Sequence, residues 1–167
     1  YFNIRVDLDQ DWFIHSTSEI DALNDISTRG WEESRKQEYL DILATGVEVT
    51  DCYAESNSGL YVINIGIVHM SEEDQADDGM AFVNRYVGLS RDVFQKNELL
   101  LSTDRLGNAT VARKSWPCWF YSSEIAECES NTVCVFLQQN DYVLILKISC
   151  LGTNVIPDIL AMSAPLE

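Results

Sequence analysis

The segment Asp7-Leu8-Asp9-Gln10-Asp11 has residue types and a spacing that could bind a cation. Its aspartates repeat at every second position, as in the opening of a calcium-binding loop. Such a loop also needs a glycine at its sixth position, for a sharp turn, and a bidentate glutamate at its twelfth. Those positions hold Trp12 and Ser18, and Glu19 comes one place late. We therefore interpret the segment as an acidic turn that closes a strand, and we predict no metal site and no cofactor.

The two histidines, His15 and His69, are the natural candidates for proton transfer near neutral pH. A hydrolase would pair one of them with a serine or cysteine nucleophile. The sequence has no G-x-S-x-G motif, and neither histidine lies near a glycine-flanked serine or a cysteine motif. For His69, near the end of a predicted strand, a surface or hydrogen-bonded role is favoured. We predict no catalytic residue, and a small hydrolase using His15 or His69 stays an alternative.

The densest aromatic cluster is WPCWFY, residues 116–121. If this segment is an edge strand, alternation places Trp116, Cys118 and Phe120 on one face. Trp119 and Tyr121 then lie on the other face. One set could line a ligand groove or a partner-binding patch, although packing in the core is the favoured interpretation.

Acidic residues are concentrated at the predicted start of a helix that follows Ser71. They are Glu72, Glu73, Asp74, Asp77 and Asp78. Negative charge is favourable in the first turns of a helix, where the helix dipole is positive. A solvated helix start is therefore favoured over a docking site for a basic partner.

The overall charge excludes nucleic acid as a partner. The chain has 167 residues, with 11 Lys and Arg against 27 Asp and Glu, which gives a net charge of −16. Such a surface repels phosphate backbones and anionic lipids, and the sequence contains no basic cluster. No apolar run is long enough to span a membrane. The chain begins at Tyr1 rather than Met, and we expect that a targeting segment has been removed.

Five cysteines, Cys52, Cys118, Cys128, Cys134 and Cys150, leave at least one thiol free in a monomer. There is no C-x-x-C motif, and two histidines are too few to complete a zinc site convincingly. Most of these cysteines lie in predicted strands, where cysteine behaves as a small apolar residue. A disulfide from Cys118 to Cys128 or to Cys134 stays open, whereas Cys134 and Cys150 should point to opposite faces of one hairpin.

These side chains must be positioned by a sheet whose centre is predicted at residues 131–150, NTVCVFLQQNDYVLILKISC. The segment is dense in β-branched and aromatic residues and is broken at residues 139–141. With Gln138 paired to Val143, the residue numbers of every pair sum to 281. Val133, Val135 and Leu137 then share one face, and Cys134 and Phe136 share the other. Both faces are apolar near the turn, so we expect a central hairpin covered on both sides.

The other elements are predicted from periodicity and turn residues. A first strand falls within residues 1–8, and residues 12–14 lead to helices at about 18–29 and 31–45. Strands at 47–54 and 60–70 flank a loop, and the helix after Ser71 has a buried stripe of Ala76, Met80, Val83, Tyr86 and Val87. A hairpin at 99–103 and 109–116, an edge strand at 118–122 and a last helix at 154–163 complete the chain. The order predicts a single α+β domain with a mainly antiparallel sheet.

Several segments together resemble the PsbP/Mog-like α/β/α sandwich, shared by a photosystem subunit, a nuclear Ran-binding protein and many secreted bacterial proteins. The matching segments are YFNIRV with Asp11-Trp12, Ser18-Glu19-Ile20, Tyr61-Val62-Ile63-Asn64-Ile65, Asp141-Tyr142-Val143 and Ile156-Pro157-Asp158-Ile159-Leu160. The resemblance covers nearly the whole chain and is closest to exported or lipid-anchored bacterial members. It implies an extracytoplasmic location, a possible lipid anchor outside this sequence, and a non-catalytic binding or accessory role.

The expected function is therefore a binding or accessory protein outside the cytoplasm, with an unknown protein or small molecule as partner. The alternatives are the small hydrolase and an intracellular adaptor that resembles the Ran-binding member. The adaptor requires a reducing compartment, so five free thiols would favour it, whereas one or three would favour an exported protein.

Overall fold

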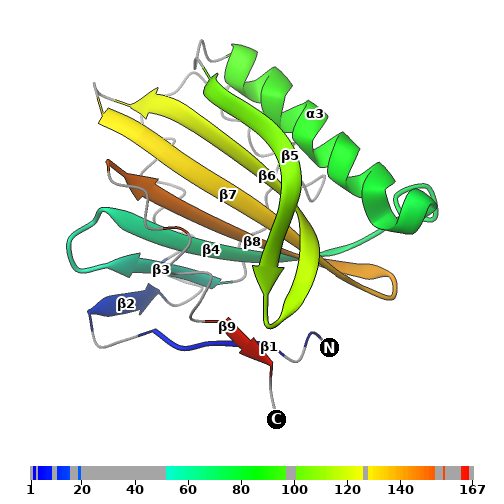
Figure 1. Cartoon of the computed structure of the whole chain (residues 1–167), viewed down its shortest axis with the longest axis horizontal. Coiled ribbons are helices and arrows are strands. Elements are labelled where there is room, and N and C mark those ends of the chain that lie inside the picture. The colour runs from blue at the N-terminus through cyan, green and yellow to red at the C-terminus, as the bar shows by residue number, and fades with distance from the viewer. Residues whose placement is uncertain are drawn as a thin grey trace.

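A seven-stranded sheet, in which each strand is antiparallel to its neighbours, forms the centre of the structure (Figure 1). The computed structural model describes residues 2, 4–8, 11–15, 19, 52–96, 101–125, 128–152, 156 and 163–165. In spatial order the strands are β2 (Trp12–His15), β3 (Cys52–Ser56), β4 (Tyr61–His69), β8 (Tyr142–Leu151), β7 (Cys128–Gln139), β6 (Lys114–Ile125) and β5 (Leu101–Val111). A separate pair joins β1 (Ile4–Val6) to β9 (Ser163–Pro165).

The β7–β8 hairpin has the predicted register. Gln138 pairs with Val143 and Val133 with Ile148, and the turn between the strands lies at Asn140 and Asp141. Asn140 adopts a left-handed conformation with φ of 56°, which asparagine tolerates better than most residues. Because β4 and β6 pair with the outer edges of this hairpin, it lies inside the sheet, as its apolar faces predicted.

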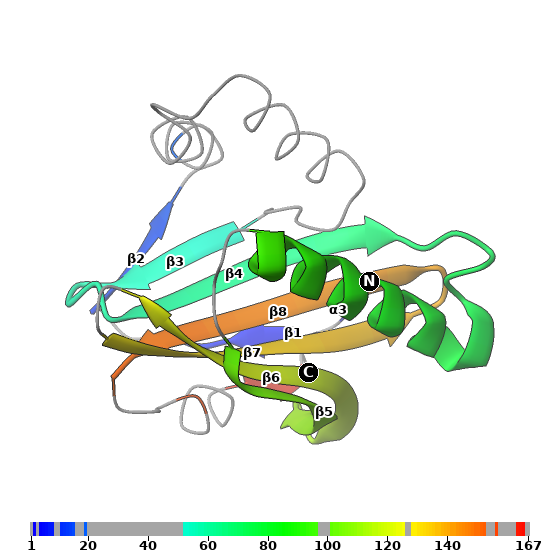
Figure 2. The same cartoon turned by 90° about the horizontal axis from the view of Figure 1, so that it is seen from above.

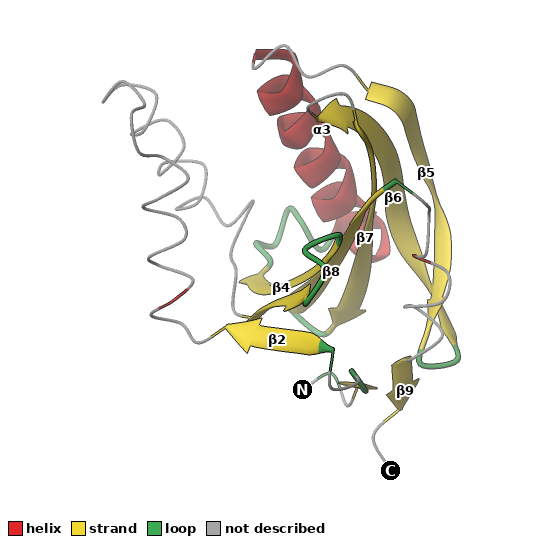
Figure 3. Cartoon of the chain, turned by 90° about the vertical axis from the view of Figure 1, so that its left-hand side faces the viewer, coloured by secondary structure: helices red, strands yellow, loops and turns green. Residues whose placement is uncertain are grey.

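The long helix α3 (Met80–Lys96) covers one face of the sheet (Figure 2). The sheet curves, and α3 lies on its concave side (Figure 3). Its buried residues are Phe82, Val83, Tyr86 and Val87, which pack against Trp119, Phe136, Val143 and Ile145 of the sheet. Val83, Tyr86 and Val87 confirm the predicted stripe, whereas Met80 is partly buried and Ala76 is exposed. Phe82 was not predicted to be buried.

The acidic segment before α3 does not form the opening turns of that helix, so this prediction was wrong. Residues 72–75 form turns and a short 3₁₀ helix, η1 (Ala76–Gly79), follows, but Asp77 and Asp78 inside it have φ of 52° and 54°. With Gly79 at φ of 81°, three successive residues are left-handed, so the chain changes direction before α3 begins. Short polar residues and glycine are the ones that tolerate this conformation.

The opposite face of the sheet has its own apolar cluster, which includes Val133, Val135, Leu137, Leu146 and Ile148. It is contacted by Phe2, Ile4, Leu8 and Trp12, which are partly buried, and it includes Ile156, which is 1% exposed. The predicted helices at 18–29, 31–45 and 154–163 fall almost entirely outside the described residues. Within those residues the fold is thus more sheet than helix, and the predicted second helical layer stays a prediction.

The predicted hairpin at 99–116 was wrong, because residues 101–111 form one continuous strand. The chain turns instead at Ala112 and Arg113, which have φ of 50° and 66°. Gly107 and Asn108 look like turn residues, but they lie in the exposed edge strand β5, where an apolar alternation is not needed. The turn between these two strands was therefore predicted too early in the chain.

Residues 118–122 were predicted as an edge strand, but β6 lies between β5 and β7. Pro117 explains the error, since proline is usually confined to edges. Its pairing with Asn108 is on the β5 side, and the β6–β7 pairing begins one residue later, with Cys118 opposite Val135. Residues 12–14 were predicted only to lead into a helix, but they belong to strand β2, which pairs with β3.

None of Cys52, Cys118, Cys134 and Cys150 is in a disulfide, so the pairings that the sequence left open, Cys118 with Cys128 and Cys118 with Cys134, are not formed. Cys118 and Cys134 belong to clusters on opposite faces of the sheet, which separates their sulfur atoms. Cys150 lies in the Cys118 cluster, so the prediction that Cys134 and Cys150 face opposite ways is confirmed.

Candidate functional site

The register of the strands gathers polar side chains on the concave face, at the end far from the β7–β8 turn. Side chains two residues apart on a strand share a face, and paired residues lie side by side. One row across the sheet consists of Tyr53, Asn64, Lys147, Cys134 and Trp119. The next rows are Val62, Ser149, Thr132 and Tyr121, and then Leu151, Ser130 and Ser123. The same face near the turn is apolar and lies under α3.

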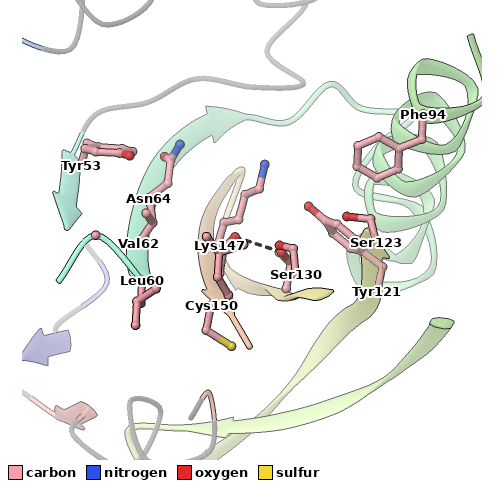
Figure 4. Close-up of a pocket in the computed structure, with 14 residues that line it drawn as sticks. Tyr53, Leu60, Val62, Asn64, Phe94, Tyr121, Ser123, Ser130, Lys147 and Cys150 are labelled. Carbon is pink, nitrogen blue, oxygen red and sulfur yellow. Dashed lines mark hydrogen bonds between the residues drawn. The ribbon is translucent and has the colours of Figure 1, made fainter. Parts of the chain in front are cut away.

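Except for Cys134 and Trp119, the residues of these rows line a pocket with a volume of about 380 Å³ (Figure 4). This is within the usual size range of a site for a small organic molecule. Leu60 and Tyr53 lie on one side of the pocket, and Tyr121 and Phe94 on the other, as Figure 4 shows. Phe94 comes from the last turns of α3, so the helix supplies one wall.

A hydrogen bond links two side chains of the floor. The hydroxyls of Thr132 and Ser149 lie 2.9 Å apart across the β7–β8 pair. Thr132 is 3% exposed, Ser130 6% and Ser123 7%. Hydroxyl groups both donate and accept, so this floor can bind a polar group of either kind.

The aromatic wall next to α3 is fixed by close ring packing. The Phe94 ring lies 5.2 Å from the Tyr121 ring, and Tyr121 lies 4.3 Å from Trp119. Trp119 is 1% exposed and its indole N–H donates to Asp104 Oδ1 at 2.7 Å. Arg91 on α3 also donates two hydrogen bonds of 2.7 Å to the Asp104 carboxylate. These bonds connect the helix to β5 beside the aromatic wall.

Lys147 gives the pocket its charge. Figure 4 shows its side chain projecting in the same direction as Asn64, with which it is paired. Burial raises the pKa of the Tyr53 phenol and the Glu55 carboxylate raises it further, whereas the Lys147 ammonium acts in the opposite direction. The Tyr53 hydroxyl therefore stays protonated at neutral pH and can donate a hydrogen bond.

His15 lies in the same row as Tyr53, on β2, and does not line the pocket. Its ring is packed edge-on against Phe13 and Tyr53, at 4.7 and 5.2 Å. Its Nε2 is 3.2 Å from Glu55 Oε1, but this buried atom makes no geometrically acceptable hydrogen bond. These neighbours include no serine or cysteine nucleophile.

His69 lies at the end of β4, with 61% of its side chain exposed. Its Nε2 is 2.9 Å from Asp141 Oδ2, and its ring packs against Tyr142 at 4.9 Å. This agrees with the hydrogen-bonded role favoured from the sequence. As for His15, the contacts of His69 give no support to a hydrolase.

The aromatic cluster at 116–121 is divided as alternation predicted. Trp116, Cys118 and Phe120 belong to the cluster on the convex side, and Trp119 and Tyr121 to the one beneath α3. Most of these side chains serve as core, and Tyr121 alone of the six residues lines the described pocket.

The two acidic segments do not come together into a metal site in the described part of the chain. There, no three His, Cys, Asp or Glu residues are grouped closely enough to hold a metal ion. Asp7 pairs with Arg5 at 3.0 Å, and Asp9 lies outside the described residues. Asp74 is held by Arg85 at 2.8 Å, whereas Glu72, Glu73, Asp77 and Asp78 are exposed.

Sequence reasoning left the binding residues unknown and so missed the pocket. The signal that could have found it is in the hairpin itself. Once residue pairs sum to 281, Thr132 faces Ser149 and both share a face with Lys147. Three polar residues at adjoining positions of an otherwise apolar central hairpin mark a place where the sheet is not covered by core. Tyr53, Leu60 and Phe94 carry no comparable signal, because each is an ordinary apolar or aromatic residue.

The described residues contain no helix that is long and apolar enough to cross a membrane.

The sequence matches no protein family and no curated protein. Among solved structures, the fold is similar to the solution structure of the cyanobacterial PsbP protein (CyanoP) from Synechocystis sp. PCC 6803, with a TM-score of 0.53. The two chains are 6% identical, and the match covers 98% of this chain and 86% of that chain. The chain therefore has a PsbP-like fold, as the resemblance of its segments predicted.

Proposed function

We propose that the protein is a non-catalytic binding protein that holds a small molecule in the pocket on the concave face. The observation that carries this proposal is the lining of the pocket. Its polar groups are hydroxyls, one amide, one amine and the Cys150 thiol, set between aromatic and aliphatic walls. Among the described lining residues there is no histidine, aspartate or glutamate, the side chains that most often exchange protons in catalysis. Such a lining favours binding and orientation of a ligand over acid–base chemistry.

The proposal is tested by screening a library of small fragments with ligand-observed NMR against the wild type and a variant with a filled pocket. Ser149→Tyr places a ring on the floor, and Ser115→Tyr is the matched control, since Ser115 is exposed in the same sheet. Fragments should bind the wild type and the control and lose binding to Ser149→Tyr. Absence of any binding fragment, or binding that Ser149→Tyr leaves unchanged, would contradict the proposal.

A second variant covers the case in which Ser149→Tyr does not fold. Leu60 lies on the rim of the pocket, is 43% exposed and follows the β3–β4 turn, so Leu60→Trp is compatible with the fold. The added indole narrows the pocket and reports ligand binding by its fluorescence. Near-ultraviolet circular dichroism checks that each variant keeps native packing.

We further propose that the protein acts outside the cytoplasm in an accessory role, as the resemblance to exported bacterial proteins implies. A fusion of the full-length protein to alkaline phosphatase, an enzyme that is active only after export, tests the location. High phosphatase activity in the producing cells is expected, and activity confined to a cytoplasmic reporter would contradict the proposal.

One observation favours the second candidate, an intracellular adaptor. Cys52, Cys118, Cys134 and Cys150 form no disulfide. Free thiols persist most readily in a reducing compartment. Burial of three of these four thiols weakens the point, because a buried cysteine survives as an apolar core residue in either compartment. The phosphatase fusion also decides between the two candidates.

A further inference from the structure

The strand β5 forms an open edge of the sheet (Figure 1). Within the described residues it pairs with β6 alone, so alternate N–H and C=O groups along its outer side have no partner strand there. It has 11 residues, whereas β2 at the opposite edge has four. Natural sheets usually keep edge strands short or covered, because an open edge can accept another strand. A long open edge is therefore a candidate docking surface.

Three cations on the β5–β6 hairpin have no carboxylate partner in the described part of the chain. They are Arg105, Arg113 and Lys114, and all three are exposed. By contrast, three arginines elsewhere are each bound to an aspartate. The one acidic residue within residues 101–123 is Asp104, which already accepts hydrogen bonds from an arginine of α3. This part of the hairpin is thus locally positive in a chain whose net charge is −16.

Two of these cations lie on the convex face, each over an aromatic ring. The Arg105 guanidinium is 5.1 Å from the centre of the Phe120 ring, and the Lys114 ammonium is 5.9 Å from that of Trp116. The next residue of β5, Leu106, is 43% exposed and pairs with Trp119 of the concave face. The edge strand therefore presents a cation on one side and an apolar side chain on the other.

We propose that β5 accepts an extended acidic segment of a partner protein, which adds to the sheet as a strand antiparallel to β5. Backbone hydrogen bonds to an open edge give such a segment its affinity, and alternate side chains give the specificity. Residues of the added strand that lie on the convex face, near Arg105, should be acidic. The residue opposite Leu106 should be apolar, because it lies on the other face. No residue of β5 lines the described pocket, so this inference stands apart from the ligand proposed there.

A second copy of the chain fits this edge less well. Two β5 strands joined antiparallel about their middle would bring Arg105 of each copy close together, and like charges across a strand pair are destabilising. The net charge of −16 on each copy would also oppose association. A short acidic segment responds mainly to the nearby cations, because charge interactions in solution are screened beyond about 8 Å at physiological salt.

The test uses a fluorescently labelled peptide with blocked ends, Glu-Thr-Glu-Thr-Glu-Val-Glu-Thr. Antiparallel to β5, with its valine opposite Leu106, the peptide places its glutamates on the convex face beside Arg105. Fluorescence anisotropy should show binding to the wild type. The same peptide with glutamine in place of glutamate should bind about tenfold less tightly. Binding of the glutamate peptide should weaken as sodium chloride is raised.

Two N-methylated peptides test for strand addition. In an antiparallel pair, only every second residue directs its N–H to the partner strand. Methylation of the backbone nitrogens of one alternate set, either the glutamates or the residues between them, should therefore abolish binding. Methylation of the other set should leave binding largely intact. Amide hydrogen exchange in β5 should also slow when the unmethylated peptide is bound.

Charge variants of the protein test the role of the cations. Arg105→Gln should weaken binding of the glutamate peptide about threefold, and adding Arg113→Gln and Lys114→Gln should weaken it about tenfold in all. Arg5→Gln is the matched control, because it removes the same charge from an exposed arginine outside the hairpin and should leave the affinity unchanged. Circular dichroism checks that each variant is folded.

Each part of the inference has an outcome that would overturn it. Failure of the glutamate peptide to bind, or equal binding of the glutamine peptide, would overturn the acidic class of partner. Equal effects of the two N-methylated peptides would overturn strand addition. Equal losses in Arg5→Gln and Arg105→Gln would overturn the role of the hairpin cations. A wild type that sediments as a dimer, with β5 amides protected only at high protein concentration, would assign the edge to a second copy instead.

Discussion

Replacing Asp74 with alanine should destabilise the protein, because this residue connects the end of β4 to α3. The Asp74 carboxylate accepts hydrogen bonds from Nε and Nη2 of Arg85, both at 2.8 Å, and from the Ser71 hydroxyl at 3.0 Å. The Ser71 hydroxyl in turn accepts from the Asp74 backbone N–H at 3.2 Å. The Asp74 side chain is 11% exposed and that of Arg85 is 39% exposed.

The magnitude follows from these two sets of contacts. The Arg85 guanidinium is partly solvated, so its pair with Asp74 is expected to contribute about 1 kcal/mol. Loss of the reciprocal bonds with Ser71 resembles loss of a helix cap and costs about 1 kcal/mol. Asp74→Ala should therefore lower the free energy of unfolding by about 2 kcal/mol. Asp74→Asn keeps an acceptor for Ser71 and should lower it by about half as much.

The assay is urea unfolding followed by circular dichroism at neutral pH. A double-mutant cycle with Asp74→Asn and Arg85→Met should give a coupling energy of about 1 kcal/mol. The cycle cancels the separate contribution of the contact between Arg85 and the Phe82 ring, which lies 5.3 Å away. The control is Asp7→Asn. Asp7 also pairs with an arginine, Arg5, but both side chains are about 60% exposed, so the change should be within about 0.5 kcal/mol.

The effect of Asp74 should also depend on pH. The hydrogen bonds from Arg85, and then those from Ser71, hold the pKa of Asp74 below its usual range. A carboxyl whose pKa is lower in the folded state stabilises the protein fully above the unfolded pKa, about 4 for aspartate. That contribution is lost as the pH falls from there through the folded pKa. The difference in stability between the wild type and Asp74→Asn should thus shrink below about pH 4. A difference that is independent of pH, or a coupling energy near zero, would refute the reasoning.

Two further predictions concern backbone geometry and thiol reactivity. Gly79→Ala should lower the free energy of unfolding by about 1–2 kcal/mol, because Gly79 has φ of 81° and a Cβ there would overlap the Gln138 side chain. Gly88 lies inside α3 with nothing within 4 Å of a Cβ, so Gly88→Ala should instead raise the free energy of unfolding by up to about 1 kcal/mol. Urea unfolding measures both changes, and two changes of the same sign would contradict this prediction. Burial raises the pKa of the Cys118 thiol to about 11, and the residue is 0% exposed. In the native protein Cys118 should therefore react with Ellman's reagent only as fast as the protein unfolds, whereas the partly exposed Cys52 should react sooner, as peptide mass spectrometry of labelled protein can measure.

The central hairpin could be predicted in detail from the sequence, for a physical reason. Its two strands are apolar on both faces near the turn, and a slip of one residue would exchange every side chain between the faces. The alternation of Trp119 and Tyr121 against Cys118 and Phe120 was predictable on the same principle. Local pattern is decisive where both faces of a strand are buried.

The exposed parts of the sheet were harder to predict. Strand β5 has its first eight residues at least partly exposed, so burial imposes no alternation on it, and Gly107 and Asn108 suggested a turn that tertiary pairing overrides. Proline has no backbone N–H, so Pro117 fits inside the sheet only where neither β5 nor β7 requires that donor. The register of the strands decides this, and the sequence pattern does not show it. The periodicity of the sequence also predicted the first turns of a helix at Asp77, Asp78 and Gly79. These residues instead have positive φ, and the chain changes direction there.

The β7–β8 hairpin contains both a part that the sequence pattern predicted, its apolar core, and a part that it missed, the polar floor of the pocket. On the concave face of the hairpin, Phe136 and Val143 near the turn are at most 2% exposed beneath α3. Thr132 and Ser149, at the other end of the same face, have hydroxyl groups bonded to each other in place of core packing. Valine at Thr132 would remove this partner of the Ser149 hydroxyl, so the pair stabilises the floor as well as offering hydroxyls to a ligand. A polar floor beside an apolar core, on strands that fix both in one register, agrees with the ligand binding that we propose, and for this reason our proposal concerns the concave face rather than the histidines.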